Sequence, residues 1–223
     1  VDVSVGRVWQ ALKDNGLADD TLLIFTSDNG GFGGATWNVP LKGSKGGFYE
    51  GGIRVPLVMS WLGTIEPGTV CETPVTGVDY MPTFAELAGA QLPDPKSQPL
   101  DGVSIVPLMK GESIAKRAIY WHYPMYLSGK EMVKPIFGTD KMYWRATPCS
   151  IVRMGDWKLM QFFETGTTEL YNVKEDIGEK NDLARQHPEK VDKMLKLLKK
   201  WQRDTGADIP SKLNPNFNPN HKK

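Results

Sequence analysis

The chain has 223 residues, 40% of them hydrophobic and 24% charged, and its 27 Lys and Arg residues are balanced by 26 Asp and Glu. This near-neutral charge excludes a general basic field for recruiting nucleic acid, so anion recognition must be local. No apolar run approaches the roughly 20 residues that a membrane-spanning helix needs. We therefore expect a globular protein with a sizeable core, no nucleic-acid partner and no membrane span.

The two cysteines, Cys71 and Cys149, are too few for a disulfide framework and lack the spacing of a zinc site. At this stage a single bridge between them remains open. The chain has no initiator Met and begins inside an expected helix. We therefore interpret the N-terminus as a cut and conclude nothing from the absence of a signal peptide.

Helical and strand patterns alternate in the first part of the chain. An apolar stripe predicts an amphipathic helix that ends near Asn15, and its members are Val5, Val8, Trp9 and Leu12. Two apolar runs, residues 21–26 and 55–61, are typical of strands buried on both faces, as in a parallel sheet flanked by helices. The Gly-rich loop between them, residues 28–52, leaves a strand where α/β enzymes place their chemistry.

The pattern changes in the middle of the chain. Residues 79–90 are expected to form a helix, with Pro82 in its first turn and Gly89 near its end, followed by a Pro-rich connection. A domain boundary is placed near Gly111. Beyond it, short β-type segments predict a small antiparallel sheet, and they are residues 118–123, 150–154, 157–163 and 169–172.

A final helix is opened by Pro188-Glu189 and has the apolar face Val191, Met194, Leu195, Leu198 and Trp201. Its other positions hold a run of lysines, which we interpret as a solvated face and not as a nucleic-acid site. Residues 211–223 are rich in Asn and Pro and are expected to be extended or disordered.

Two adjacent oxygen-bearing side chains, Asp28 and Asn29, close the first strand and are followed by two glycines. A carboxylate and an amide carbonyl at the end of a strand suit a hard cation such as calcium, which takes six to eight oxygen ligands. The alternative is a simple turn, because Asp, Asn and Gly are common turn residues.

The second half of the same loop carries two lysines, Lys42 and Lys45, among small residues. Glycines allow backbone amides and a lysine ammonium to approach a tetrahedral anion, so sulfate or phosphate beside a cation fits this loop. The alternative for both lysines is solvent-exposed loop charge. Glu50 and Arg54 lie four residues apart, and we expect them to pair with each other.

These residues resemble a known family. Asp28-Asn-Gly30, followed by Lys45-Gly-Gly-Phe-Tyr-Glu-Gly-Gly-Ile-Arg-Val-Pro56, is similar to the second half of the type I sulfatases, the formylglycine-dependent members of the alkaline phosphatase superfamily. Further on, Asp101-Gly-Val-Ser-Ile-Val-Pro-Leu108 resembles the segment that closes their catalytic domain. The sequence Gly155-Asp-Trp-Lys-Leu159 resembles part of their C-terminal subdomain. The resemblance covers about residues 1 to 210.

The resemblance implies an α/β fold. Residues 1–110 are expected to be the C-terminal part of an alkaline-phosphatase-like sulfatase domain. Residues 111–210 are expected to form a small α+β subdomain with an antiparallel sheet and a C-terminal helix, before the tail of residues 211–223. Location in the periplasm, outside the cell or in the lysosome is implied as well, with the targeting segment outside this chain.

The resemblance also implies site residues. Asp28 and Asn29 match calcium ligands, with one Ca²⁺ per intact active site, and Lys45 matches a catalytic lysine that contacts the substrate sulfate. In such enzymes a Cys or Ser is converted to formylglycine, whose hydrate attacks sulfur. The family also has a pair of aspartates near its N-terminus, a formylglycine segment and a catalytic histidine. None of these three features has a match in this chain. We therefore expect that the N-terminal half of the domain is missing and that this chain alone is inactive.

Two further residues need weighing. Cys149 and Arg153 have the spacing of a formylglycine segment, but Ile151 stands where a small residue or proline is needed, so we interpret this segment as a strand. His122 lies among aromatic residues in Trp-His-Tyr-Pro. It is either a satisfied core histidine or, as similar segments of carbohydrate sulfatases imply, a substrate-binding residue near the entrance.

The resulting hypothesis is a sulfuric ester hydrolase whose partners are a sulfated saccharide or aryl sulfate and the missing half of its own domain. A phosphoesterase or phosphonate hydrolase of the same superfamily is the first alternative, because sulfate and phosphate are near-isosteric. A non-catalytic remnant that binds an anion or a carbohydrate is the second.

Overall fold

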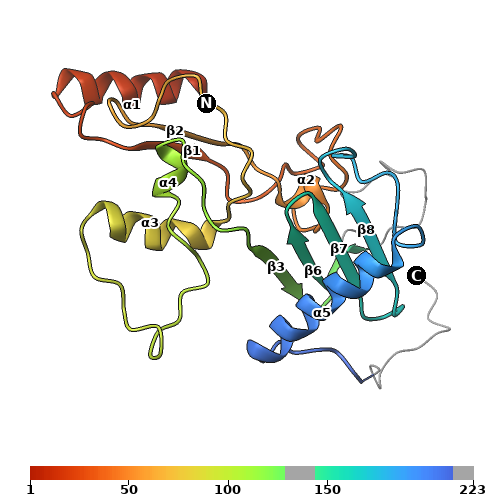
Figure 1. The fold of residues 1–223 in the computed structure, drawn as a ribbon. Helices are drawn as coiled ribbons and strands as arrows, with labels where there is room; N and C mark the ends of the chain where they lie inside the picture. Colours follow the sequence, from red (N-terminus) through yellow and green to blue (C-terminus); the bar gives the residue numbers. More distant parts are fainter. Residues whose placement is uncertain (129–143, 213–223) are drawn as a thin grey trace. The chain divides into compact units, whose positions relative to one another are not determined.

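The computed structural model describes residues 1–128 and 144–212 and divides into two compact units (Figure 1). The first unit comprises residues 1–28 and 55–117, and the second comprises residues 29–54 together with the chain from residue 118 onward. From residue 213 on, the expected Asn/Pro-rich tail lies outside the described residues. The assignment of residues 1–110 and 111–210 to separate domains remains a prediction.

The first unit begins with the predicted helix, α1 (Asp2–Asp14), which ends at Asn15 before Gly16 at φ +67°. Both predicted strands form, as β1 (Leu23–Thr26) and β2 (Leu57–Ser60). They pair with each other antiparallel, so the expected parallel arrangement is wrong within the described residues.

Because the N-terminal half of the domain is expected to be missing, the first helix and strand should expose apolar surface, and they do. Phe25 is 37% exposed and Val58 is 59% exposed, and α1 contributes no buried residue. The apolar pattern indicates a preference for burial. In the described part of this unit, several of these apolar side chains nevertheless remain exposed.

The predicted helix over residues 79–90 is confirmed as a 3₁₀ turn, η1 (Gly77–Asp79), followed by α3 (Tyr80–Leu87). Thr76 and Asp79 cap it reciprocally through side-chain bonds to backbone N–H groups. The buried Asp79 carboxylate also accepts the N–H of Val103 at 3.0 Å and pairs with Arg117. Asp79 thus ties the helix to the segment before α4 (Val106–Met109).

The second unit is built on a sheet of four antiparallel strands, counted over residues 118–128 and 144–212. Its spatial order is β3-β6-β7-β8, comprising β3 (Ala118–Tyr123), β6 (Cys149–Met154), β7 (Trp157–Phe162) and β8 (Thr168–Asn172). The predicted small sheet and the final helix, α5 (Pro188–Asp204), are confirmed. Short elements were not expected, and they are α2 (Glu50–Ile53), β4 (Leu127–Ser128) and β5 (Trp144–Ala146).

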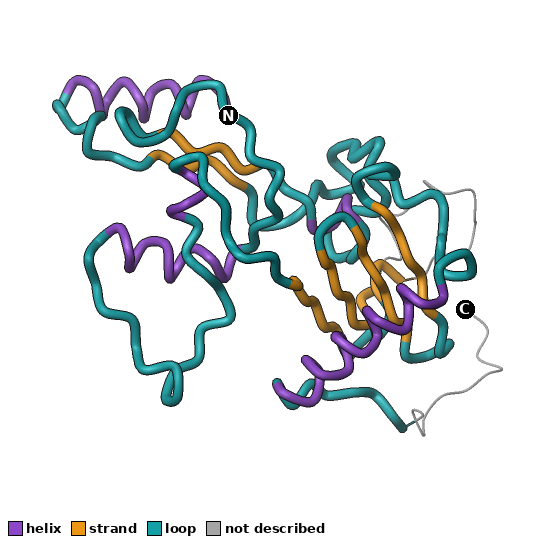
Figure 2. Tube along the Cα trace, in the orientation of Figure 1, coloured by secondary structure: helices purple, strands orange, loops and turns teal. Residues whose placement is uncertain are grey.

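Strand alternation gives the sheet two different apolar faces. One face packs against α5, which lies across the strands in Figure 1, and its buried cluster is Val152, Leu159, Leu170, Val191, Met194 and Leu198. The other face buries Cys149, Ile151, Met160, Tyr171 and Val173 under Phe48 and Tyr49 of the 29–54 segment. The sheet therefore lies between a helix and a loop, and Figure 2 shows how much of that second layer is loop.

Cys71, which is exposed, and Cys149, which is buried, are both free in this structure. Along α5, Lys193, Lys196, Lys199 and Lys200 are exposed, as expected of a solvated face. In the part of the chain that the structure describes, no helix is both long and apolar enough to cross a bilayer.

Candidate functional site

Segment 29–54 is held together mainly by main-chain contacts between glycines and carbonyl groups. The N–H of Gly30 donates to Gly52 O at 2.9 Å, and the N–H of Gly51 donates to Lys42 O at 2.7 Å. A Cβ atom added at Gly51 would lie 2.3 Å from Gly43 O, and one at Gly52 would lie 2.1 Å from Gly47 O. These glycines are therefore required for the backbone to pack on itself, a purpose distinct from the anion approach expected from the sequence.

Lys45 lies in this packed segment with an exposed side chain. Its N–H donates to Gly31 O at 2.9 Å. Gly46, at φ +88°, follows it beneath the side chains of Leu127 and Arg145. The fold thus brings Lys45 beside the stretch that begins at Asn29, while its side chain stays open to solvent.

Asp28 and Asn29 follow β1 at a bend of the chain. Asp28 is exposed and is the last residue of the first stretch of its unit, residues 1–28, whereas Asn29 is half-buried and is the first residue of the second unit. Their carboxylate and amide oxygens suit a hard cation but make up only part of the six to eight oxygens that calcium takes. Within residues 1–128 and 144–212, no group of three or more His, Cys, Asp or Glu side chains gathers as a metal site.

Lys42 is not the exposed loop charge that the sequence suggested. Its ammonium lies 3.8 Å from the centroid of the Tyr49 ring and 3.3 Å from the hydroxyl of Tyr171. Both tyrosine hydroxyls donate to one oxygen of Glu169, at 2.7 and 2.8 Å. Burial lowers the pKa of Lys42, although Glu169 opposes this shift. Lys42 is therefore a fixed cation that joins the loop to the sheet.

The expected pair of Glu50 and Arg54 is confirmed at 2.7 Å, and it belongs to a larger buried cluster. Lys158 of β7 lies 3.1 Å from Glu50 and 2.8 Å from Glu179, and all three side chains are at most 1% exposed. Burial opposes ionisation of Glu50, but Lys158 and Arg54 outweigh it and lower its pKa. At Glu179 burial prevails, and the pKa is raised.

The buried position of Lys158 is not predicted by the apolar and motif patterns of the sequence. The available signal is its position in Trp157-Lys-Leu-Met160, where alternation places it on the same face as the buried Met160.

His122 lies on β3 directly opposite Ser150 of β6. Its Nδ1 is 2.7 Å from Ser150 Oγ, and its Nε2 is 3.0 Å from the carbonyl oxygen of Asp208. The rings of Phe163 and Trp201 meet it edge to face. Both ring nitrogens thus have protein partners, as in a satisfied core histidine, and a contact with a saccharide would use the ring itself.

Cys149 is 2% exposed within β6, and burial raises the pKa of its thiol to about 12. A protonated, buried thiol is a poor nucleophile. The interpretation of this segment as a strand is confirmed.

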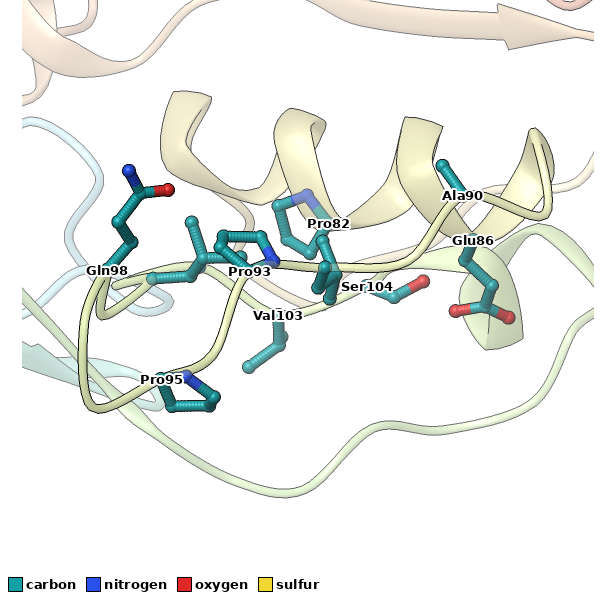
Figure 3. A pocket seen from close by; sticks show the side chains of 11 residues that line it. Pro82, Glu86, Ala90, Pro93, Pro95, Gln98, Val103 and Ser104 are labelled. Atoms are coloured by element: carbon teal, nitrogen blue, oxygen red, sulfur yellow. The ribbon is translucent and has the colours of Figure 1, made fainter.

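The first unit contains a cavity of about 520 Å³ between α3 and the Pro-rich connection (Figure 3). Its walls are largely apolar and include Pro82, Pro93, Pro95 and Val103, and the polar residues Glu86 and Ser104 also line it. None of the candidate site residues lines it.

The chain is similar to sulfatases over most of its length. The family described as N-sulphoglucosamine sulphohydrolase, C-terminal, matches residues 44–204. A sulfatase of Formosa agariphila is 38% identical over 218 residues, which are 90% of this chain and 38% of that protein. Human arylsulfatase A is 39% identical over 132 residues, 56% of this chain and 25% of the relative.

Two solved structures share the fold. Ps i-CgsB in complex with k-i-k-neocarrahexaose has a TM-score of 0.73 and 32% identity, covering 92% of this chain and 41% of its own. The phosphonate monoester hydrolase of Agrobacterium radiobacter has a TM-score of 0.65 and 28% identity, covering 91% and 39%. The chain thus spans less than half the length of each of these proteins.

Substitution at the glycine packing should reveal its role. Gly51→Ala should destabilise the chain by about 1–3 kcal/mol, because the new methyl group would meet a main-chain oxygen that cannot move away. Gly6→Ala is the matched control: it lies within α1 with nothing near its Cβ position, and should stabilise by about 0.5–1 kcal/mol. Urea denaturation measures both, and equal effects would contradict the packing role.

Proposed function

We propose that this chain, which belongs to the sulfatases of the alkaline phosphatase superfamily and corresponds to their C-terminal region, contributes sulfate-binding and calcium-binding residues to a sulfuric ester hydrolase. The observation that carries the proposal is the hydrogen bond from the N–H of Lys45 to Gly31 O, which brings the exposed lysine beside the stretch that follows Asp28 and Asn29. A cationic side chain and the amide oxygen of Asn29 on one packed segment, with the carboxylate of Asp28 directly before it in the chain, suit a sulfate ester bound next to a metal ion.

Each residue has a distinct part in this proposal. Lys45 would contact the sulfate oxygens and stabilise the negative charge that grows on them as the ester bond breaks. Asp28 and Asn29 would hold calcium through their side-chain oxygens. In enzymes of this type calcium supplies a Lewis acid and formylglycine supplies the nucleophile. This chain's own residues bind and orient the sulfate.

The proposed substrate is a sulfated carbohydrate or an aryl sulfate. The solved relative at 32% identity holds neocarrahexaose, and the human relative is an arylsulfatase. A phosphonate monoester hydrolase at 28% identity favours one second candidate, a phosphonate or phosphate ester hydrolase on the same scaffold. For the sulfatase we also propose a location in the periplasm, outside the cell or in the lysosome.

The first test concerns Lys45 in the full-length sulfatase. Lys45→Ala should lower kcat on an aryl sulfate by about 100-fold, because removal of a preorganised charge from a developing oxyanion typically costs that much. Lys42→Ala is the comparison variant and should cost far less, since the Lys42 ammonium lies against Tyr49 and Tyr171 and is not free to contact the sulfate. A larger loss for Lys42→Ala would place the sulfate elsewhere, and equal activity on aryl phosphonate would favour the second candidate.

Calcium binding provides a test that does not depend on turnover. The 223-residue chain should bind calcium only weakly, because Asp28 and Asn29 donate at most about three oxygens and water must fill the other positions. Calorimetric titration measures the affinity, with Asp28→Ala and Asp101→Ala as site and control variants. Micromolar affinity that persists in Asp28→Ala would show that the calcium ligands have been misassigned.

The substrate role of His122 is tested by comparing two substrates of the full-length enzyme. His122→Ala should raise KM for the natural sulfated saccharide more than for a small aryl sulfate, since the proposed contact is with the sugar. Thermal unfolding accompanies the kinetics, because the variant also loses the bonds to Ser150 and Asp208. Equal losses on both substrates would instead support the interpretation of His122 as a purely structural core histidine.

A further inference from the structure

The second unit contains a buried cluster of charges, Glu50, Lys158 and Glu179, to which the proposed function assigns no role. Glu50 begins α2, Lys158 belongs to β7, and Glu179 lies in the loop after β8. The ammonium of Lys158 lies 3.1 Å from one carboxylate and 2.8 Å from the other. Because all three side chains are at most 1% exposed, none can reach a substrate directly.

Such a cluster is a weak source of net stability, because removing three charges from water offsets most of their mutual attraction. What it provides is a particular geometry. Glu179 is held at φ +49°, a left-handed conformation that residues other than glycine seldom adopt. In that conformation its carboxylate faces Lys158 and also accepts the N–H of Glu50 at 2.6 Å. The cluster therefore fixes the main chain at Glu50 as well as its side chain.

The main chain at Glu50 leads to Lys45 through two short routes. The N–H of Gly51 bonds to Lys42 O, and a Cβ on Gly52 would touch the carbonyl oxygens of Ser44 and Gly47. On the other side, Gly52 O accepts the N–H of Gly30, and the neighbouring Gly31 O accepts the N–H of Lys45. A displacement of Glu50 would therefore displace both stretches that hold Lys45 in place.

We propose that Lys158, together with Glu50 and Glu179, is a positioning group that sets the place of Lys45 on the loop. The catalytic consequence rests on the proposed function of Lys45. The placement of the loop does not depend on it.

Hydrogen exchange of the 223-residue chain tests the placement. The triple variant Glu50→Gln, Lys158→Met, Glu179→Gln removes the charges of these three residues with side chains of similar size. Arg54 and Arg153, which also pair with Glu50, lose that carboxylate but are both partly exposed to solvent. The control Lys200→Met, Asp204→Asn removes an exposed ion pair on α5. We expect exchange of the Lys45 amide to quicken about tenfold or more in the triple variant alone, while amides of β6 and β7 stay protected.

Unchanged protection of Lys45 in a folded triple variant would overturn the proposal. Should the triple variant fail to fold, Glu179→Gln alone is measured in the same way, since it retains the pair of Lys158 with Glu50. Faster exchange at Lys45 in that variant supports the proposal, and unchanged exchange overturns it.

A double-mutant cycle in the full-length sulfatase tests the route through Lys45. The triple variant should lower kcat on an aryl sulfate about tenfold in the wild-type background and cause no further loss in the Lys45→Ala background. Equal losses in both backgrounds would show a general structural effect and overturn that route. Full activity of Lys45→Ala alone would overturn the proposed function, while the exchange result would still decide the placement of the loop.

Discussion

Lys158 carries its charge where water does not reach, and the second unit depends on how that charge is balanced. One carboxylate comes from α2 and the other from the loop after β8, so the cation is compensated only when both segments are in place on the sheet. Charges a few ångströms apart in a poorly polarisable interior interact strongly, and an unpaired one is costly to bury. Phe48 and Tyr49 make apolar contacts that fill the surrounding space. Apolar contacts have no preferred direction, so they do not by themselves fix the position of the loop on the sheet.

The two faces of the four-stranded sheet are chemically different for this reason. Against α5 the strands bury an apolar cluster that includes Val152 and Leu159. On the opposite face Ile151 and Met160 share their space with tyrosine hydroxyls, buried glutamates and two lysines. The first face supports the sheet as a platform, while the second holds a polar loop in a set position. The candidate sulfate contact belongs to the second face.

Much of the second unit could be predicted because its strands and final helix have strong, local periodicities. The errors come from contacts that local patterns do not contain. Lys42 was predicted to be an exposed loop lysine. Its ammonium instead contacts Tyr171, which is bonded to Glu169, and both residues lie about 130 positions further along the chain. Lys158 was missed because a lysine in a strand normally faces solvent. The antiparallel pairing of β1 with β2 was not predicted because an apolar run does not reveal its partner. Asp28, Asn29 and Lys45 were identified by family resemblance, which supplies chemistry that residue patterns leave ambiguous.

The contacts between α2 and the lysine-bearing loop are made by main-chain atoms at glycines, which has a consequence for engineering. A combinatorial library that randomises Gly43, Gly51 and Gly52 should return almost only glycine among folded members, since any side chain there meets a carbonyl oxygen or a strained backbone. Lys45, whose side chain is exposed, carries no such restriction on side-chain size. A library aimed at the stability of this loop should therefore keep these glycines fixed, and Lys45 as well, because the proposed function requires its charge.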